Sequence, residues 1–432
     1  MRKIFSICII MVLSGSFAFS GGLFVTPGTR AGAMGGAYTG IADDATAIYW
    51  NPAGLVQING SGVELDIIYV KRNATSNTSL MNVNTPDEKD GDFPLPKVYP
   101  TEPNEYNSKK FTTNSFLPFI AGYSKINDIS LAGGFYAIGG GGGNWNDTVK
   151  GGVDDVSVSV DGALGFIIGN ISAAKKIVSK VYVGIGLNYI YSIDNTEVEK
   201  QYTRATGSSM PSDYSVAIEK SGTGNGIQMV LGTMYIPIDK LRMGFVYKNG
   251  TTVNISGKSE YTLTGLASLG LPDVNNETNY SQNYAYPATY SFGASYDPIN
   301  PLTIAFSIIV NKYSVLKNDV DYKNETVFKD VNTSLNYSDT TQVMIGGEYR
   351  MAKISLRGGF QIDPGPAPSD KRTLLDTKMY SHKVIYLGFG YKLKMLRTDF
   401  SYGYSMSNKP NKNEREYKYS GGGYRLTVGY EY

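Results

Sequence analysis

Regular alternation of apolar residues with small or polar ones is the feature that most limits how this chain can fold. In "VYVGIGLNYIY" an apolar or aromatic residue stands at every second position from Val181 to Tyr191. This period of two is typical of a β-strand with one apolar face. The pattern recurs at Val63, Leu65, Ile67 and Tyr69; at Leu241, Met243, Phe245 and Tyr247; at Ile385, Leu387, Phe389 and Tyr391; and at Tyr424, Leu426, Val428, Tyr430 and Tyr432. We therefore predict an all-β protein.

The connections between the predicted strands alternate between short and long. "IND" at Ile126, "PIDK" at Pro237, "DPINP" at Asp297 and the junction near Ala352 are short, whereas the intervening connections are long and polar. Short turns at one rim and long loops at the other are typical of outer-membrane barrels. The sequence thus predicts a transmembrane β-barrel over residues 60–432.

About fourteen antiparallel strands are expected in this barrel. Their approximate ranges are 62–70, 115–124, 129–138, 156–170, 181–193, 223–236, 240–256, 282–297, 301–315, 337–351, 353–363, 379–394, 396–407 and 421–432. An even number of strands places both termini on the periplasmic side. The last strand ends on Tyr432 with aromatic or aliphatic residues at alternate positions, the form expected of a strand recognised for membrane insertion.

Residues 1–20 have the features of a secretory signal peptide. Arg2 and Lys3 precede an apolar run, and small residues stand at Ala18 and Ser20, as a cleavable signal requires. The only cysteine, Cys8, lies within it, so we expect neither disulfides nor thiol chemistry in the mature chain. We place the protein in the outer membrane of a Gram-negative bacterium.

Composition excludes several other classes of protein. Loss of Arg2 and Lys3 leaves basic residues equal in number to the 38 acidic ones, so no field of one sign attracts nucleic acid. Beyond the signal, no apolar stretch approaches the roughly 18 residues of a spanning helix. The 34 Tyr and 50 Gly against 1 His suit strands with aromatic residues at the membrane interface and small residues inside.

Residues 21–59, which we call the N-terminal segment, precede the first predicted strand. "DDATAIYW" suggests a short helix with Asp43 and Asp44 in its first turn, where the helix dipole favours carboxylates. Pro52 disfavours helical dihedrals at Asn51, so "WNPAG", which includes Ala53, predicts a rigid turn. We expect the segment to fold as a hatch inside the barrel.

At these residues the chain resembles the FadL/TodX family of outer-membrane transporters of long-chain fatty acids and aromatic hydrocarbons. The resemblance rests on "GAMGGAYTGIADDATAIYWNPAGL", "YIPIDKLRMGFVYKN", "YPATYSFGASYDPINPLTIAFSIIVNKYS" and "SLRGGFQIDPGPAP", which run in family order over the mature chain. It implies a fourteen-stranded barrel closed by a hatch of about forty residues. It also implies passive uptake of a hydrophobic small molecule, captured at the outer rim and released sideways into outer-membrane lipid.

Sideways release requires a weak place in the barrel wall. The predicted third strand reads "ISLAGGFYAIGGGGG", and interior glycines are typical of bends and bulges. We therefore predict a lateral gate at Gly133, Gly134, Gly139 and Gly140. The alternative is that these glycines only make room for the hatch.

Two groups of residues are candidate ligand contacts. The predicted rim loop "LTGLASLGLP" has leucines at nearly helical spacing, and the family resemblance makes it part of a capture groove; a small self-packed loop core is the alternative. The leucines are Leu263, Leu266, Leu269 and Leu271. In the lumen, Arg357 is the candidate cation, although an ion pair with Glu348 that braces the hatch is the favoured interpretation of both residues.

One departure from the family pattern bears on the substrate. Where fatty-acid carriers of the family can have basic residues, this chain has Ile193 and Ser338, and a carboxylate ligand should meet Lys or Arg in a dry site. The sequence thus favours a neutral hydrocarbon or another lipophile.

Other functions are less consistent with these patterns. The chain has one histidine, His382, and no recognisable nucleophile motif with which it could form a catalytic triad. Clusters of metal ligands are also absent from the sequence, so we expect no enzyme, cofactor or metal. We also expect a monomer. A diffusion porin would lack the hatch. A related barrel that serves as a secretion accessory or protein-binding platform, without transport, remains the alternative function.

Overall fold

The fold is described from a computed structural model of the chain. The description covers residues 26–76, 109–139, 142–150, 154–204, 213–265, 267, 272–324, 328–366, 381–407 and 417–432. Within these residues no helix is both long and apolar enough to cross a membrane.

All strands belong to a single antiparallel sheet that closes on itself, because β1 pairs with β19 on one side and with β2 on the other. The strands are β1 Ser61–Ser76, β2 Lys109–Ile126, β3 Ile129–Gly139, β4 Gly142–Lys150, β5 Asp154–Val178, β6 Val181–Arg204, β7 Tyr214–Ile238, β8 Leu241–Lys248, β9 Thr251–Thr264, β10 Val274–Tyr286, β11 Thr289–Ile299, β12 Leu302–Asn311, β13 Lys317–Tyr322, β14 Val331–Ser334, β15 Thr340–Met351, β16 Ile354–Asp363, β17 His382–Leu393, β18 Leu396–Ser407 and β19 Tyr417–Glu431.

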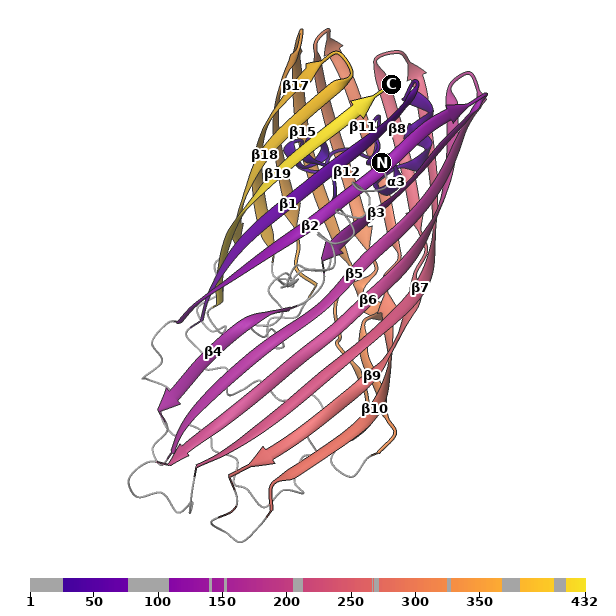
Figure 1. Ribbon diagram of the computed structural model, residues 1–432. Coiled ribbons are helices and arrows are strands. Elements are labelled where there is room, and N and C mark those ends of the chain that lie inside the picture. Colours follow the sequence, from indigo (N-terminus) through magenta and orange to yellow (C-terminus); the bar gives the residue numbers. More distant parts are fainter. Residues whose placement is uncertain are drawn as a thin grey trace.

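Some wall strands are interrupted and therefore consist of two of these elements. The pairs β3 with β4, β8 with β9, β10 with β11, β12 with β13, and β14 with β15 each follow one line of the wall, so the barrel has fourteen strands. The 3-10 turn η4 (Tyr313–Val315) separates β12 from β13. This confirms the all-β class and the expected number of strands. Figure 1 shows the closed barrel that these strands form.

The alternation in the sequence separates lipid-facing from lumen-facing residues. On β1, Val63, Leu65 and Ile67 are exposed, whereas Glu64 and Asp66 between them are buried. An outward apolar face matches the hydrocarbon layer, and an inward polar face is typical of a barrel lumen.

The two rims of the barrel differ as expected. Two-residue turns join β2 to β3, β5 to β6, β7 to β8, β11 to β12, β15 to β16 and β17 to β18. Several of these turns place a residue in the left-handed region, such as Asn127 with φ 55° and Ala352 with φ 47°, which tight hairpins require. The C-terminus closes at the same rim, where the Tyr432 amide donates to the Ser61 carbonyl at 2.8 Å.

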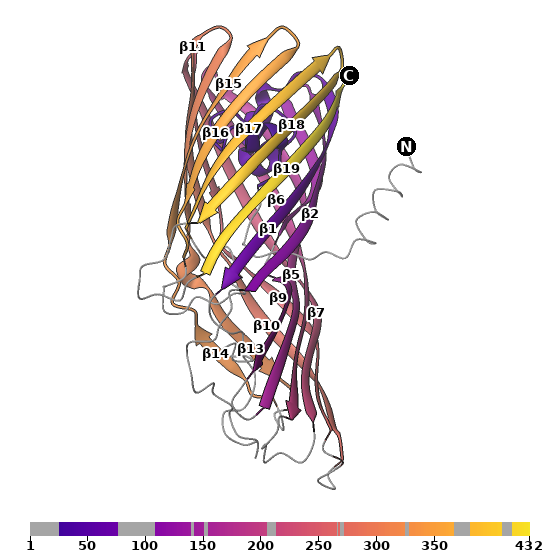
Figure 2. The same ribbon diagram turned by 90° about the vertical axis from the view of Figure 1, so that its left-hand side faces the viewer.

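Part of the wall extends well beyond the rest of the barrel. Strands β5, β6 and β7 have 25, 24 and 25 residues, whereas about 9–11 tilted residues cross a bilayer. Figure 1 and Figure 2 show these strands, with β9 and β10, projecting past the opposite wall at the end away from the two-residue turns.

The N-terminal segment lies inside the barrel, near the rim with the two-residue turns (Figure 2). It contains helix α2 (Thr29–Ala33), helix α3 (Ala47–Trp50) and the 3-10 helix η1 (Pro52–Gln57). The interpretation of Asp43 and Asp44 as first-turn residues is wrong, because α3 begins only at Ala47. Instead, Asp44 precedes the helix and accepts from the Thr46 amide at 3.0 Å, which caps the turn that leads into it.

The Asn51–Pro52 turn has the expected geometry. Asn51 is extended, with φ −168° and ψ 104°, and its side chain accepts from the Ala53 amide at 3.1 Å. Its amide nitrogen donates to the carbonyls of Thr39 and Thr233, each at 3.0 Å. The turn therefore joins two parts of the N-terminal segment to the wall strand β7.

Glycines of the wall allow the N-terminal segment to approach strand backbones closely. A Cβ added at any of them would lie less than 3 Å from an atom of the segment; they are Gly184 on β6, Gly232 on β7, Gly244 on β8, Gly293 on β11, Gly346 on β15, Gly359 on β16 and Gly388 on β17. We call this set the glycine belt. The belt runs around much of the lumen and holds the segment in backbone contact with the wall.

Candidate functional site

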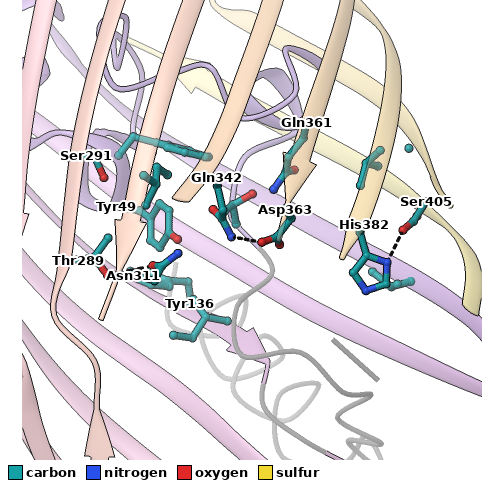
Figure 3. Close-up of a pocket in the computed structure, with 18 of the residues that line it drawn as sticks. Tyr49, Tyr136, Thr289, Ser291, Asn311, Gln342, Gln361, Asp363, His382 and Ser405 are labelled. Atoms are coloured by element: carbon teal, nitrogen blue, oxygen red, sulfur yellow. Dashed lines mark hydrogen bonds between the residues drawn. The ribbon is translucent and has the colours of Figure 1, made fainter. Parts of the chain in front are cut away.

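A cavity of about 180 Å³ lies in the lumen beside the N-terminal segment. Tyr49 and Trp50 of α3 form part of its lining, and the rest comes from strands around the barrel. Figure 3 shows Tyr49 and Tyr136 on one side, with Asp363, His382 and Ser405 on the other.

The walls of this cavity differ in chemistry. Ile138, Ile168 and Ile309 provide aliphatic surface near the aromatic rings. The polar part of the lining contains Asn188, Gln228, Asn311, Gln342, Gln361, Asp363, His382 and Ser405. Mostly apolar walls with a few placed polar groups are typical of small-molecule sites, and this cavity is more polar than a simple hydrocarbon pocket would be.

Two cations also line the cavity, and we did not select either from the sequence. Lys248 Nζ lies 3.6 Å from the centroid of the Tyr49 ring. Arg425 donates from Nη1 to the Thr26 carbonyl at 2.7 Å, which ties β19 to the N-terminal segment. The period of two in the sequence does predict that both side chains face the lumen. Lys248 follows outward Tyr247, and Arg425 stands between outward Tyr424 and Leu426.

Buried ion pairs connect the N-terminal segment to the wall. Arg30 of α2 donates to both carboxylate oxygens of Glu348 on β15, at 2.8 and 2.9 Å, and to Asp43 at 2.5 Å. Burial raises the pKa of Asp43, but the adjacent Arg30 guanidinium outweighs it and holds that pKa below its ordinary value. We call Arg30, Asp43, Asp44, Glu348, Arg357, Arg397 and Asp399 the charged cluster.

Arg357 belongs to this cluster and not to the cavity. Its side chain is 3% exposed, and it donates to Glu348 and to Asp399, each at 2.6 Å. It is absent from the cavity lining. The interpretation of Arg357 as a ligand-binding cation therefore needs correction: two buried carboxylates already use its charge. The ion pair with Glu348 that the sequence suggested is present.

A second anchor holds the start of the N-terminal segment. Asp66 on β1 accepts from the Gly28 amide at 2.9 Å and from the Thr29 hydroxyl at 2.5 Å. Thr427 on β19 donates to the same carboxylate at 2.8 Å. The segment is thus tied to β1, β15 and β19, and through Asn51 to β7.

Of the four leucines predicted for the rim loop, the structure describes Leu263. Leu266, Leu269 and Leu271 lie outside the described residues. Leu263 is 1% exposed and pairs within β9 against Val216 and Val274. It is therefore part of a buried strand, not of an exposed rim loop.

The hydrogen-bond ladder of the predicted gate strand ends partway. β2 pairs with β1 from Ser124 to Lys109, but its pairing with β3 stops at Phe119 and Tyr136. In the described residues, β4 pairs only with β5. Among the described residues, no ladder therefore joins β2 to β3 or β4, which together form the third wall strand, beyond Tyr136.

β3 moves inward where this ladder ends. Ala137, which follows inward Tyr136, is buried against Leu117 and Ile68, two residues on the inner face of β2 and β1. Gly139 has φ 84° and lies at a register shift against β5. A β-bulge at a glycine bends a strand in this way.

The four predicted gate glycines have different roles. Gly133 and Gly134 lie within the regular ladder, opposite Gly122 and Ala121, so the break begins after them and not at them. No atom of the N-terminal segment is among their nearest neighbours, whereas the glycine belt contacts that segment directly. Only Gly139 lies at the bend, and Gly140 falls outside the described residues.

His382 lies in the cavity wall, with Nδ1 3.2 Å from the Ser405 hydroxyl oxygen. Within the described part of the chain, no group of three or more His, Cys, Asp or Glu side chains could hold a metal ion.

Comparison with known proteins gives a consistent picture. A family model described as outer membrane protein transport protein (OMPP1/FadL/TodX) matches residues 11–431. No curated protein sequence matches.

Several solved structures share the fold. A FadL homologue from Pseudomonas aeruginosa is 16% identical, with 95% of this chain and 100% of that chain covered and a TM-score of 0.71. The toluene transporter TodX from Pseudomonas putida is 16% identical, with 97% and 100% covered and a TM-score of 0.68. The toluene transporter TbuX from Ralstonia pickettii is 17% identical, with 94% and 98% covered and a TM-score of 0.63.

Proposed function

Since this chain belongs to the OMPP1/FadL/TodX family of outer membrane transport proteins, we propose that it carries small hydrophobic molecules from the lumen cavity sideways into the outer-membrane lipid. The exit lies between β2 and the bent third wall strand. Transport is passive and needs neither a catalytic step nor a cofactor. A single chain forms a complete lumen, because its own first and last strands pair, and in this proposal it acts as a monomer.

The single observation that carries this proposal is the end of the β2–β3 ladder at Phe119 and Tyr136. Unpaired backbone groups facing hydrocarbon are costly, so open edges are not expected within the lipid layer unless other groups cover them. A break at an inward bend lets an apolar molecule leave without crossing water. Each methylene kept out of water saves roughly 0.8 kcal/mol.

The cavity supports a small ligand. An apolar cavity of about 150 Å³ binds benzene, and the cavity here is about 180 Å³. Val70 of β1 and Ile138 of β3 both line it, so it extends to strands on either side of β2. The names of TodX and TbuX identify those proteins as toluene transporters, which is consistent with a monoaromatic ligand for this chain.

The N-terminal segment acts as the hatch in this proposal. It fills the lumen beside the cavity, and its ties to the wall are polar contacts and close backbone packing rather than covalent bonds. A small shift of α3 would open the cavity without disturbing the barrel ladder.

A disulfide across the break tests the exit. Leu117→Cys with Ala137→Cys joins two residues that pack together beyond the last ladder pair. In cells that express this variant, uptake of radiolabelled toluene should fall to background after oxidation and return after reduction. The native chain adds no competing thiol, because its only cysteine is Cys8 in the expected signal peptide.

The matched control joins the same two strands inside the ladder. Lys125 pairs with Ser130, so Lys125→Cys with Ser130→Cys should leave uptake unchanged when oxidised. Full uptake by a verified Leu117–Ala137 disulfide would rule out the lateral exit. No uptake above empty cells by any variant would instead favour a binding platform without transport.

A further inference from the structure

Among the residues that the structure describes, Lys248 is a lumen lysine without a charged partner. It ends β8 on the inward face, after Val246, which is 0% exposed, and it lines the cavity. No hydrogen bond or ion pair joins its ammonium to another described residue. Its ammonium instead makes a cation–π contact with the face of the Tyr49 ring. By contrast, Arg357 and Arg397 are each paired with carboxylates.

Tyr49 connects this ammonium to the break in the wall. Its ring lies edge-on to Tyr136, with centroids 5.8 Å apart, and to Trp50 at 5.1 Å. Tyr136 is the last β3 residue paired with β2, and its ring packs on Phe119 at 5.9 Å. A continuous row of rings thus runs from Lys248 to the point where the two strands separate.

We propose that Lys248 binds the anionic group of a small aromatic carboxylate, and that this binding releases Tyr49 from its place beside the break. The inference rests on the proposed function and names its ligand class. It differs from the sequence-based expectation of a neutral lipophile, which considered Ile193 and Ser338 but not Lys248.

The competing contacts favour this exchange. A carboxylate offers the ammonium a charge-assisted hydrogen bond, which is generally stronger than a cation–π contact at a half-buried site. The isoleucines of the lining accommodate the apolar ring of the ligand. Asp363 lies on the other part of the lining and accepts from Gln342 at 2.9 Å, so its repulsion orients an anionic group away from it and toward Lys248.

Fluorescence of Trp50 can report the release of Tyr49. The chain has 2 Trp, so Trp145→Phe leaves Trp50 as the single reporter, next to Tyr49. The protein in nanodiscs near pH 6, where benzoate is still ionised and protonation of a buried lysine is favoured, is titrated with benzoate and with benzamide, which have nearly the same shape but differ in charge. Benzoate should bind at least about tenfold more tightly, the scale of one hydrogen bond to a charged group, and should shift the Trp50 emission.

Variants separate the charge from the ring. In the Trp145→Phe background, Lys248→Met should abolish the preference for benzoate, and Lys248→Arg should retain it. Lys175→Met, at an exposed position beside a two-residue turn, is the matched control and should behave like the parent. Tyr49→Phe keeps the ring face and should keep the emission shift, whereas Tyr49→Leu should lose it.

Three results would overturn the proposal: equal binding of benzoate and benzamide, a benzoate preference that survives Lys248→Met, or benzoate binding without a change in Trp50 emission. These readouts do not depend on the wall exit. Failure here with toluene uptake still blocked by the Leu117–Ala137 disulfide would leave the proposed function intact. An ineffective disulfide would count against the lateral exit even if benzoate binds as expected.

Discussion

Arg30 is the residue on which the attachment of the N-terminal segment most depends. Its side chain is 10% exposed and binds Glu348, which is 1% exposed, and Asp43. Removal of Arg30 leaves Asp43 without its direct ion pair, whereas Glu348 keeps Arg357; loss of one partner from a buried pair costs up to about 3–5 kcal/mol. The lost interaction energy weakens the attachment of the N-terminal segment to the wall. The barrel itself is unaffected, because α2 takes no part in strand pairing.

Arg30→Met should therefore loosen the N-terminal segment while the barrel stays folded. We expect larger and more frequent ion-conducting openings in planar bilayers, with unchanged heat-modifiable mobility of the folded barrel in gels. Arg350→Met is the matched control: Arg350 lies 3.6 Å from the same Glu348 carboxylate, but its side chain is 45% exposed, so its pair is worth little. Equal conductance of both variants would contradict the assigned role of Arg30.

At the scale of elements, the glycine belt explains why glycines recur on the inner face of strands β6 to β17. On β15, Gly346 faces the lumen, and an added Cβ would lie 2.2 Å from the Met34 carbonyl oxygen. At its neighbour Gly347, the nearest atom would be 3.7 Å away, which is ordinary contact. The two adjacent positions therefore offer a direct test of the belt.

Gly346→Ala should displace the N-terminal segment from β15 and raise ion conductance, because the contact is with backbone that cannot turn aside. Gly347→Ala should leave conductance at the level of the parent. The measurement is single-channel recording of each purified variant. If Gly346→Ala leaves the ion conductance unchanged, the N-terminal segment can move away from β15 without opening a path for ions.

At the scale of the whole molecule, the barrel has one short rim and one extended rim. Strands of 24 or 25 residues exceed what a bilayer requires by more than ten residues. The family is located in the outer membrane, so the extended part of β5, β6 and β7 is expected to stand outside the cell, with the N-terminal segment near the periplasm.

Cysteine labelling on intact cells checks this orientation. Glu199→Cys on the extended part of β6 should react with a membrane-impermeant maleimide. Asp128→Cys in the β2–β3 turn should react only after the outer membrane is permeabilised. Both native residues are exposed, so access and not burial decides the outcome. The reverse pattern would invert the topology.

The fold class and the inward or outward side of each strand residue can be predicted from the amino-acid sequence alone. The period of two distinguishes outward Leu65 from inward Asp66, and the same rule identifies Lys248 and Arg425 as lumen residues. The short connections between strands predicted the rim with the two-residue turns, and Asn51 and Pro52 predicted the turn that they form. These properties depend on residues close together in the chain, so they can be predicted from a single sequence.

Which inward-facing residues contact one another depends on the three-dimensional closure of the barrel. Arg30 and Glu348 are 318 positions apart, and Lys248 reaches Tyr49 only because the N-terminal segment packs at one height in the lumen. The glycine run suggested a weak strand, but the position of the break depends on how far β2 keeps pairing with β3. Such contacts arise from closure of the barrel around the segment, and no local pattern specifies the distance between residues that closure brings together.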